Sequence, residues 1–328
     1  MKRVFSGVQP SGMIHLGNYS AMKNFVKLQD NPENDCFYCI VDLHSVTVPQ
    51  DPKSLYEHSL ELAALFIAIG LDPMKSTLFL QSQVPAHTEL AWLLQCNSYM
   101  GELNRMTQFK DKSEKLVSVT NGLYTYPILM AADILAYDTH YVPVGNDQQQ
   151  HIELTRDIAL RFNNKYGDTF VVPEGFYPKV GARIMSLDDP TSKMSKSNEN
   201  ALSKIGLLDS ESQIKKSIMR ATTDSESEIR LDWENKPGIS NLLTLYSVFG
   251  NTTVEALEKK YTSQGYGTLK KDLVEVIIEY LKPIKQRYSE LRNSQELKEI
   301  LMAGAAHADE ISSEVLKRVK KKMGFVQF

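Results

Sequence analysis

The strongest constraint on the fold is an alternation of short apolar runs with helix-like segments at the start of the chain. Residues 3–8 and 76–81 are β-prone, and residues 35–41 (DCFYCIV) lack the polar alternation of a half-exposed strand, which suits a strand covered on both faces. Helical patterns separate these runs at residues 18–29 and after Asp51-Pro52, an N-cap followed by a proline, up to Gly70. The alternation predicts a parallel α/β sheet with right-handed crossovers.

The remaining chain has a different pattern. Residues 86–138 are mostly helical in pattern, residues 141–144 resume a strand, and residues 147–166 form a helix before Gly167. Beyond residue 198 the pattern is helical only, with breaks at Pro237-Gly238, Gly250, Gly265 and Pro283 and one long terminal helix. We therefore expect a doubly wound, Rossmann-like α/β domain over 1–198 with a helical insertion at about 86–138. An all-helical domain should follow over 199–328, and its last helix can pack back on the first domain.

Composition narrows the class of protein. Hydrophobic residues make up 42% of 328 residues, enough for a sizeable core. The net charge of −3 excludes a polybasic binder but allows a local basic patch. No apolar run approaches the ~18 residues of a membrane span, and the N-terminal MKRVFSGVQP breaks at Gly7 and Pro10 before a signal-peptide core can form. We expect a soluble, cytoplasmic protein with no membrane partner.

The three cysteines argue against a disulfide scaffold and for a reducing compartment. Cys36 and Cys39 form a lone C-x-x-C, but strand residues three apart point to opposite faces and cannot share a metal. Cys96 lies on a separate helix. We expect buried thiols and no zinc or iron–sulfur centre.

A first candidate site is the segment GVQPSGMIHLGN at residues 7–18, which follows the first predicted strand and opens a helix. Doubly wound folds bind nucleotides at this position. Gly17 would let an adenine or ribose lie on the backbone, while Ser11 and His15 can donate to phosphate oxygens. A β–α turn with His15 at the surface explains the segment equally well. The segment matches neither a dinucleotide fingerprint nor a P-loop.

A second candidate site is the KMSKS segment, Lys193 to Ser197, in a polar stretch where the two predicted domains meet. Two lysines three apart, with hydroxyl residues between and after them, can surround the phosphates of a nucleoside triphosphate. A mobile loop of this kind can close on the triphosphate and reopen to release pyrophosphate. The alternative is a solvated linker, which the position at the end of the α/β pattern disfavours.

Taken together, PSGMIHLGN and KMSKS resemble the paired signatures of class I aminoacyl-tRNA synthetases. The segments at 125–135, 142–159, 178–187 and 236–243 resemble the bacterial tryptophanyl-tRNA synthetase family in order and spacing, and the similarity covers nearly the whole chain. Ile128, Asn146 and Asn198 stand where proline, glutamate and aspartate are expected. None removes a required group, although Asn146 lowers the charge near the ribose.

The resemblance implies that ATP, as its Mg²⁺ complex, activates L-tryptophan as an adenylate, and that a homodimer then esterifies tRNA(Trp). It also implies that the helical domain over 199–328 binds the anticodon. A tyrosyl-tRNA synthetase with the same fold is the main alternative. Its pocket would need hydrogen bonds to a phenol. Two further alternatives are weaker. A small adenylyltransferase would need neither the KMSKS loop nor the helical domain, and a non-catalytic tryptophan sensor would not need the intact lysines.

Matching positions imply the roles of individual residues. Catalysis is assigned to Lys193, Lys196, Lys112 and His15, with no metal ligand from a protein side chain. ATP binding is assigned to Gln9, Pro10, Ser11, Gly17, Asn18, Gly145, Asn146, Asp147, Ile184, Lys193, Met194, Ser195, Lys196 and Ser197. Tryptophan binding is assigned to Asp133, Phe5, His44, Tyr126, Met130, Val142, Val144 and Gln148.

Three of these interpretations keep an alternative. Asp133 is expected to accept the indole N–H, but it could be a structural cap, and Lys112 could be an exposed helix charge. His151 is expected to pack behind the site. The basic residues 317–322 could attract tRNA phosphates or complement the last helix dipole. Residues 92–99 and 128–135 are the expected dimer surface.

Overall fold

The computed structural model describes residues 1–113, 118–177, 183–196 and 198–327, without the side chains of residues 20, 21, 111 and 112. Over these residues the sheet has five parallel strands in the order β3-β2-β1-β4-β5. Their bounds are β1 Lys2–Val8, β2 Asn34–Ile40, β3 Ser76–Leu80, β4 Tyr141–Pro143 and β5 Glu174–Phe176. The doubly wound sheet is confirmed. The strand order reverses between β1 and β4, which marks the carboxyl ends of these strands as the place for a ligand.

The central strand β2 is covered on both faces, as its unbroken apolar run predicts. Cys36 and Tyr38 belong to a core shared with α1 (Leu16–Gln29) and α3 (Pro52–Ala68). Phe37 and Cys39 belong to a second core on the other face. The opposite orientation of the two cysteines is therefore confirmed. Cys96, in contrast, is exposed, so the expectation of a buried thiol is wrong at that position.

The helices on the second face come from the segment between β3 and β4 and from the chain beyond β4. They are α4 (Ala86–Gln95), α5 (Met100–Leu103), α6 (Thr107–Ser113), α7 (Asn121–Leu135) and α8 (Gln149–Tyr166), with the short helix α2 (Asp42–Ser45) and the 3-10 turns η1 (Gln81–Gln83) and η2 (Asn146–Gln148) at the strand ends. Ile128 and Leu135 are buried within the chain, so residues 128–135 are wrongly assigned to a dimer surface.

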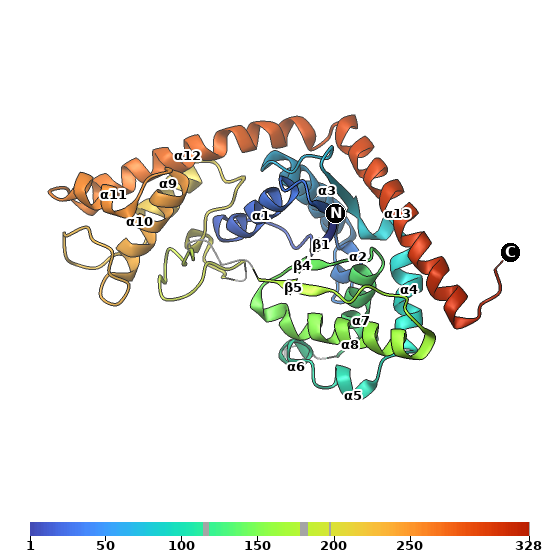
Figure 1. Ribbon diagram of the computed structural model, residues 1–328. Helices are drawn as coiled ribbons and strands as arrows, with labels where there is room; N and C mark the ends of the chain where they lie inside the picture. The colour runs from blue at the N-terminus through green and yellow to red at the C-terminus, as the bar shows by residue number, and fades with distance from the viewer. Residues whose placement is uncertain (114–117, 178–182, 197, 328) are drawn as a thin grey trace.

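After η3 (Ala201–Ser203) the chain is helical, in α9 (Glu211–Met219), α10 (Pro237–Phe249), α11 (Val254–Tyr261), α12 (Tyr266–Leu291) and α13 (Gln295–Met323). Helix α12 continues through Pro283, so the expected break is wrong there. Figure 1 shows α9–α11 set apart from the sheet, α12 spanning the distance back to it, and α13 descending along its flank. The Tyr19 and Tyr280 hydroxyls, 2.7 Å apart, join α1 to α12.

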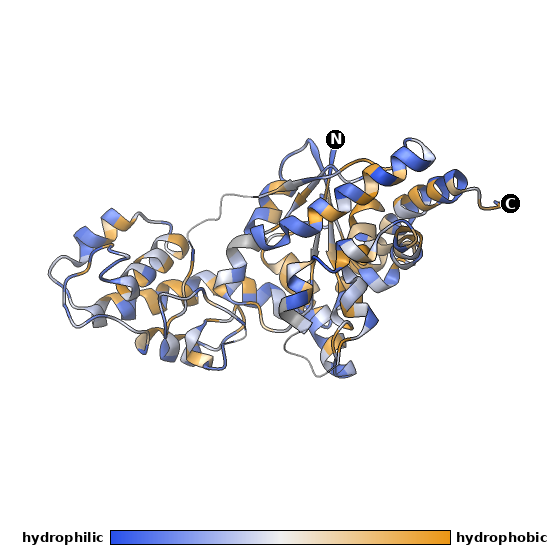
Figure 2. Ribbon diagram, turned by 90° about the horizontal axis from the view of Figure 1, so that it is seen from below, coloured by the Kyte–Doolittle hydropathy of each residue, from blue (hydrophilic) through white to orange (hydrophobic). Residues whose placement is uncertain are grey.

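The last helix is fastened to the α/β part by charged side chains. Lys320 pairs with Glu89 of α4 at 2.8 Å, and Arg318 donates to the Thr169 carbonyl at 3.0 Å. Arg318 and Lys320 are among the basic residues for which the sequence analysis left two roles open, binding of tRNA phosphates or interaction with the helix dipole. In the structure both contact other parts of the chain. In Figure 2 hydrophobic residues alternate with hydrophilic ones along the helices, as expected where each helix has one packed face. Among the described helices, none combines the length and apolar character of a membrane span.

The contact between α13 and β3 generates a test. A Cβ at Gly304 would lie 2.0 Å from the Leu78 carbonyl oxygen, so the helix backbone rests directly on the strand. Gly304→Ala should lower the free energy of unfolding by about 1–3 kcal/mol in a denaturant titration, since the clash outweighs the gain in helix propensity. Gly267→Ala is the matched control, because a Cβ there meets nothing within 4 Å. It should be neutral or stabilise by about 0.5–1 kcal/mol. Equal effects would refute the close contact.

Candidate active site

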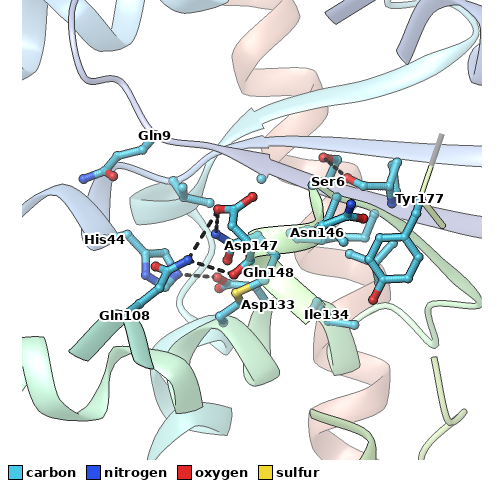
Figure 3. Close-up of a pocket in the computed structure, with 18 of the residues that line it drawn as sticks. Ser6, Gln9, His44, Gln108, Asp133, Ile134, Asn146, Asp147, Gln148 and Tyr177 are labelled. Atoms are coloured by element: carbon cyan, nitrogen blue, oxygen red, sulfur yellow. Dashed lines mark hydrogen bonds and ion pairs between the residues drawn. The ribbon is translucent and has the colours of Figure 1, made fainter. Parts of the chain in front are cut away.

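A cavity of about 990 Å³ opens at the carboxyl ends of β1, β2 and β4, where the strand order reverses. Most residues assigned from the resemblance line it: Phe5, Gln9, Gly17, His44, Tyr126, Met130, Asp133, Val142, Val144, Gly145, Asn146, Asp147, Gln148, Ile184 and Lys193. Figure 3 shows labelled polar side chains from several of these segments converging on the cavity. Segments far apart in sequence thus meet where the topology predicts a ligand.

At one end of the cavity a buried carboxylate lies among apolar and polar lining residues. Asp133, on α7, is only 1% exposed. Its Oδ2 accepts from His44 Nε2 at 2.7 Å, and its Oδ1 accepts from Gln81 Nε2 at 2.7 Å and from His87 Nδ1 at 2.6 Å. Figure 3 draws the His44–Asp133 contact. These partners belong to α2, η1 and α4, so Asp133 ties three other segments together through side-chain hydrogen bonds.

The charge of Asp133 is set by opposing effects. Burial raises the pKa of this carboxyl, but the charge and hydrogen bond of His44 and the hydrogen bond of His87 outweigh burial and hold the pKa below its usual range. A carboxylate has about four acceptor positions. Gln81 and His87 fill both on Oδ1, while His44 fills one on Oδ2. Counting contacts from the described residues, one acceptor position therefore remains on this ionised group.

A second polar cluster borders the same end of the cavity. The Tyr126 hydroxyl donates to Gln108 Oε1 at 3.2 Å and lies 2.9 Å from His151 Nε2. Burial raises the pKa of Tyr126 to about 12, so the phenol keeps its proton at neutral pH. Gln148 Nε2 donates to the Asp147 carboxylate at 2.7 Å. His151 is buried behind Tyr126, as expected of a packing residue.

The other end of the cavity is formed by the loops after β1 and β4 and by Ile184 and Lys193. Gly17 faces crowded surroundings, because a Cβ there would lie 3.0 Å from the His15 ring and 3.4 Å from the Met194 Cβ. Any larger residue would push these groups apart. The glycine therefore keeps the start of α1 close to the KMSKS segment.

His15 is 2% exposed, which overturns the alternative of a surface histidine. It caps α1, and its Nδ1 accepts the Gly17 N–H at 3.1 Å, which leaves the ring proton on Nε2. Burial, followed by the charges of Lys196, Lys204 and Lys193, lowers the pKa of His15 to about 4. The ring is therefore neutral at pH 7, a donor without a charge of its own.

The structure brings the two signature segments together. Lys196 Nζ donates to Ser11 Oγ at 3.0 Å, across 185 positions of sequence. An antiparallel bridge between His15 and Gly206 adds the hydrogen bonds Leu16 N to Ile205 O and Leu207 N to Ile14 O, both 2.9 Å. These contacts hold residues 205–207, which follow the KMSKS segment, against the start of α1.

Further contacts join the KMSKS segment to Met185 and to Lys204. Lys193 pairs with Met185, whose N–H donates to Asn241 Oδ1 at 2.9 Å. Asn241 lies in the 236–243 segment on α10, which explains why that segment accompanies KMSKS in the resemblance. Lys204 Nζ donates to the carbonyls of Lys196 and Asn198 at 2.7 and 2.8 Å. Met194 is buried in the core and anchors the segment.

Some assigned residues lie outside the cavity lining or outside the description. The assigned residues that do not line the cavity are Pro10, Ser11, His15, Asn18, Met194, Ser195 and Lys196, although Ser11, His15, Met194 and Lys196 make the contacts above. Ser197 lies outside the described residues, as does the side chain of Lys112 on α6. The lining also includes Gln108 and Arg183, which the sequence analysis missed, and Gln81 and His87 were missed behind Asp133.

Comparisons with known proteins agree with this arrangement. The Tryptophan--tRNA ligase of Caldanaerobacter subterraneus subsp. tengcongensis is 60% identical over 99% of both chains. That of Bacillus subtilis is 56% identical over 98% of this chain and 97% of its own. A crystal structure of Tryptophanyl-tRNA Synthetase from Campylobacter jejuni complexed with ADP and tryptophan superposes with a TM-score of 0.88 at 39% identity, covering 98% of this chain and all of that one.

A tyrosyl-tRNA synthetase from Archaeoglobus fulgidus shares the fold with a TM-score of 0.67 at 17% identity, over 88% of this chain and 90% of that one. The family model for class I tRNA synthetases (W and Y) matches residues 1–282. The family model covers most of the chain, and the two relatives are 60% and 56% identical to it. The chain therefore belongs to the class I tRNA synthetase family (W and Y).

Proposed function

We propose that this chain is a tryptophan–tRNA ligase, which forms tryptophanyl-adenylate from L-tryptophan and ATP and then transfers the tryptophanyl group to tRNA(Trp). The observation that carries the proposal is the buried, ionised Asp133 with one acceptor position left in the cavity wall beside a nucleotide-type loop. The relatives above, named for tryptophan at 56–60% identity, support it over the tyrosine alternative.

The amino-acid end of the cavity suits an indole. The ring of tryptophan is large and apolar and carries one donor-only N–H. Phe5, Met130, Val142 and Val144 provide apolar wall, and Asp133 provides a charge-assisted acceptor for that N–H. Tyr126 and Gln148 lie where their oxygens can accept from the substrate ammonium. A side chain without a donor would leave the remaining position of Asp133 buried and unpaired, which costs free energy.

At the nucleotide end, the first reaction is an in-line displacement. A tryptophan carboxylate oxygen attacks the α-phosphorus of ATP, the bond to the β-phosphate oxygen breaks, and diphosphate leaves. The enzyme supplies no covalent nucleophile, so catalysis rests on positioning and charge stabilisation. Lys193 and Lys196 would neutralise the departing diphosphate, with Lys112 on α6 assisting. Gln9, Gly17, Gly145, Asn146, Asp147 and Ile184 would hold the adenosine.

His15 would donate from Nε2 to a phosphate oxygen. Because its Nδ1 is engaged by the Gly17 N–H, the donor direction is fixed before ATP arrives. ATP would enter as its Mg²⁺ complex, with the ion carried by phosphate oxygens. In the second reaction a ribose hydroxyl of the terminal adenosine of tRNA(Trp) attacks the acyl carbon, and AMP leaves.

The helical region α9–α12 is the proposed tRNA platform, and the exposed Trp92, Tyr99 and Met100 on α4 and α5 are the proposed homodimer surface, since exposed aromatic clusters mark such interfaces. A cytoplasmic location would give the enzyme access to ATP and tRNA.

Replacing Asp133 tests the proposed substrate. Asp133→Asn keeps shape and an acceptor oxygen but loses charge, so kcat/KM for tryptophan in pyrophosphate exchange should fall moderately. Asp133→Ala should reduce it further and narrow the preference over phenylalanine, which for a buried hydrogen-bonding site reaches roughly 10⁴–10⁵. Unchanged preference in the alanine variant would place specificity elsewhere. Faster exchange with tyrosine than with tryptophan in the wild type would overturn the function.

Replacing Lys196 tests the phosphate loop. Lys196→Ala should lower the rate of adenylate formation far more than the affinity for tryptophan, because the lysine charge matters most when diphosphate departs. Single-turnover adenylation and equilibrium tryptophan binding measure the two effects. The control is Lys282→Ala, which removes an exposed lysine of α12 and should change neither. Normal turnover with weaker tryptophan binding would contradict the assignment.

His15 should make stability depend on pH. Its pKa is lowered from 6.5 to about 4 in the folded chain, so between these values the unfolded state binds more protons. Acidification therefore destabilises the fold across this window, by at most about 1.4 kcal/mol per pH unit from this group, and above pH 6.5 the contribution is constant. His15→Asn, which keeps a cap, should flatten the stability curve between pH 6.5 and 4 in denaturant titrations. Parallel curves for both proteins in this window would refute the assignment.

A further inference from the structure

We propose that His87 and Tyr137 are positioning residues of the tryptophan pocket, forming a buried hydrogen-bonded relay that fixes the orientation of Asp133 from the far side. The inference deepens the proposed function and rests on it, since it concerns how the acceptor for the indole N–H is held. Neither His87 nor Tyr137 lines the cavity.

The relay is continuous and dry. His87, at the start of α4, and Tyr137, just after α7, are both 0% exposed. His87 Nδ1 lies 2.6 Å from Asp133 Oδ1, and His87 Nε2 lies 2.7 Å from the Tyr137 hydroxyl. The chain of contacts thus runs from Tyr137, in the second core, through His87 to the back of the pocket.

The chemistry of each group fixes the direction of every proton. An ionised Asp133 can only accept, so His87 must donate from Nδ1. In an imidazole that donates from Nδ1 alone, Nε2 is the acceptor, which requires the Tyr137 hydroxyl to donate. Burial raises the pKa of Tyr137 well above its ordinary value, so the phenol keeps the proton that this order needs. All donors point toward Asp133.

Packing prevents the relay from changing its geometry. The Tyr137 ring stacks on Phe5 at 5.5 Å between centroids and on Phe37 at 5.0 Å. Phe5 is itself part of the cavity wall. The hydroxyl of Tyr137 therefore has a fixed position from which to orient the imidazole.

The consequence for Asp133 concerns its two oxygens. Gln81 and His87 occupy Oδ1 completely and hold the carboxylate plane, so the remaining acceptor position lies on Oδ2, which also accepts from His44. Without the His87 donor, Oδ1 has an unpaired position of its own. The carboxylate can then rotate to satisfy it, and an indole N–H no longer meets a prepared acceptor.

The experiment measures recognition of the N–H itself. The probe is β-(benzothiophen-3-yl)alanine, a tryptophan analogue with sulfur in place of the N–H. The readout is the ratio of kcat/KM for tryptophan to that for the analogue in pyrophosphate exchange. A substitution that merely loosens the pocket lowers both values and leaves the ratio unchanged. Loss of an oriented, charged acceptor lowers the ratio by roughly 10–100-fold, the value of a hydrogen bond to a charged group.

Two substitutions of His87, by asparagine and by glutamine, test its role because their side-chain amides differ in length. The amide nitrogen of His87→Asn lies near the former Nδ1, toward Asp133, whereas that of His87→Gln reaches the former Nε2, toward Tyr137. The asparagine variant should keep the wild-type ratio, and the glutamine variant should lose roughly 10–100-fold. Tyr137→Phe should lower the ratio by a smaller factor. The matched control is Tyr38→Phe, which removes another buried hydroxyl, bonded to the Phe25 carbonyl on the opposite face of the sheet, and should leave the ratio unchanged.

Asp133→Ala separates the two hypotheses. If it leaves the ratio at the wild-type value, the indole acceptor is wrong and the proposed pocket fails with it. If Asp133→Ala lowers the ratio while His87→Gln and Tyr137→Phe keep it, the pocket stands and the relay is overturned. Equal ratios in His87→Asn and His87→Gln would also overturn the relay, since position 87 would then act only through packing.

Discussion

The structure of the pocket depends on keeping one buried carboxylate ionised. An isolated buried charge is prohibitively costly, so Asp133 requires donors, and it obtains them from His44 after β2, Gln81 after β3 and His87 on α4. These segments meet only because parallel strands end at the same edge of the sheet. The carboxylate thus depends on the topology, and the topology at this edge is held in turn by the hydrogen bonds that converge on the carboxylate.

A corresponding constraint acts at the nucleotide end, with the opposite sign of charge. Lys193, Lys196 and Lys204 lie close enough to His15 to lower its pKa, so this end is electropositive before any phosphate arrives. Lys196 is itself partly buried, and burial lowers its pKa as well. A phosphate chain entering here would relieve repulsion among cations and remove an unfavourable field. The neutrality of His15 limits that repulsion while keeping a donor in place.

The sheet was predictable from sequence because its strands are continuous apolar runs bounded by strong signals, such as the Asp51 cap and Gly70. Strand β5 was missed because its three residues, Glu174–Phe176, include a glutamate and a glycine, which strands disfavour, whereas the equally short β4 has the β-prone sequence YVP. Pro283 was misjudged because α12 continues through the proline. The sequence analysis identified cavity residues where they lie in the segments that resemble the synthetase family. Gln81, His87 and Tyr137 lie in ordinary helical or strand-end context, and only tertiary contact reveals their link to Asp133.

The two ends of the cavity are supported by different cores. Ile184 and Met194, on either side of the nucleotide end, belong to the core that includes α1, α3 and the C-terminal helices. Phe5 and Val142, in the amino-acid wall, belong to the core on the other face of the sheet. Helix α13 takes part in both cores, with Leu301 in the first and Ala308 and Val315 in the second, so the last helix bridges the supports of the two ends. The strand-order reversal between β1 and β4 brings both ends to one opening, so the proposed indole acceptor and the proposed phosphate loop can act on the same bond.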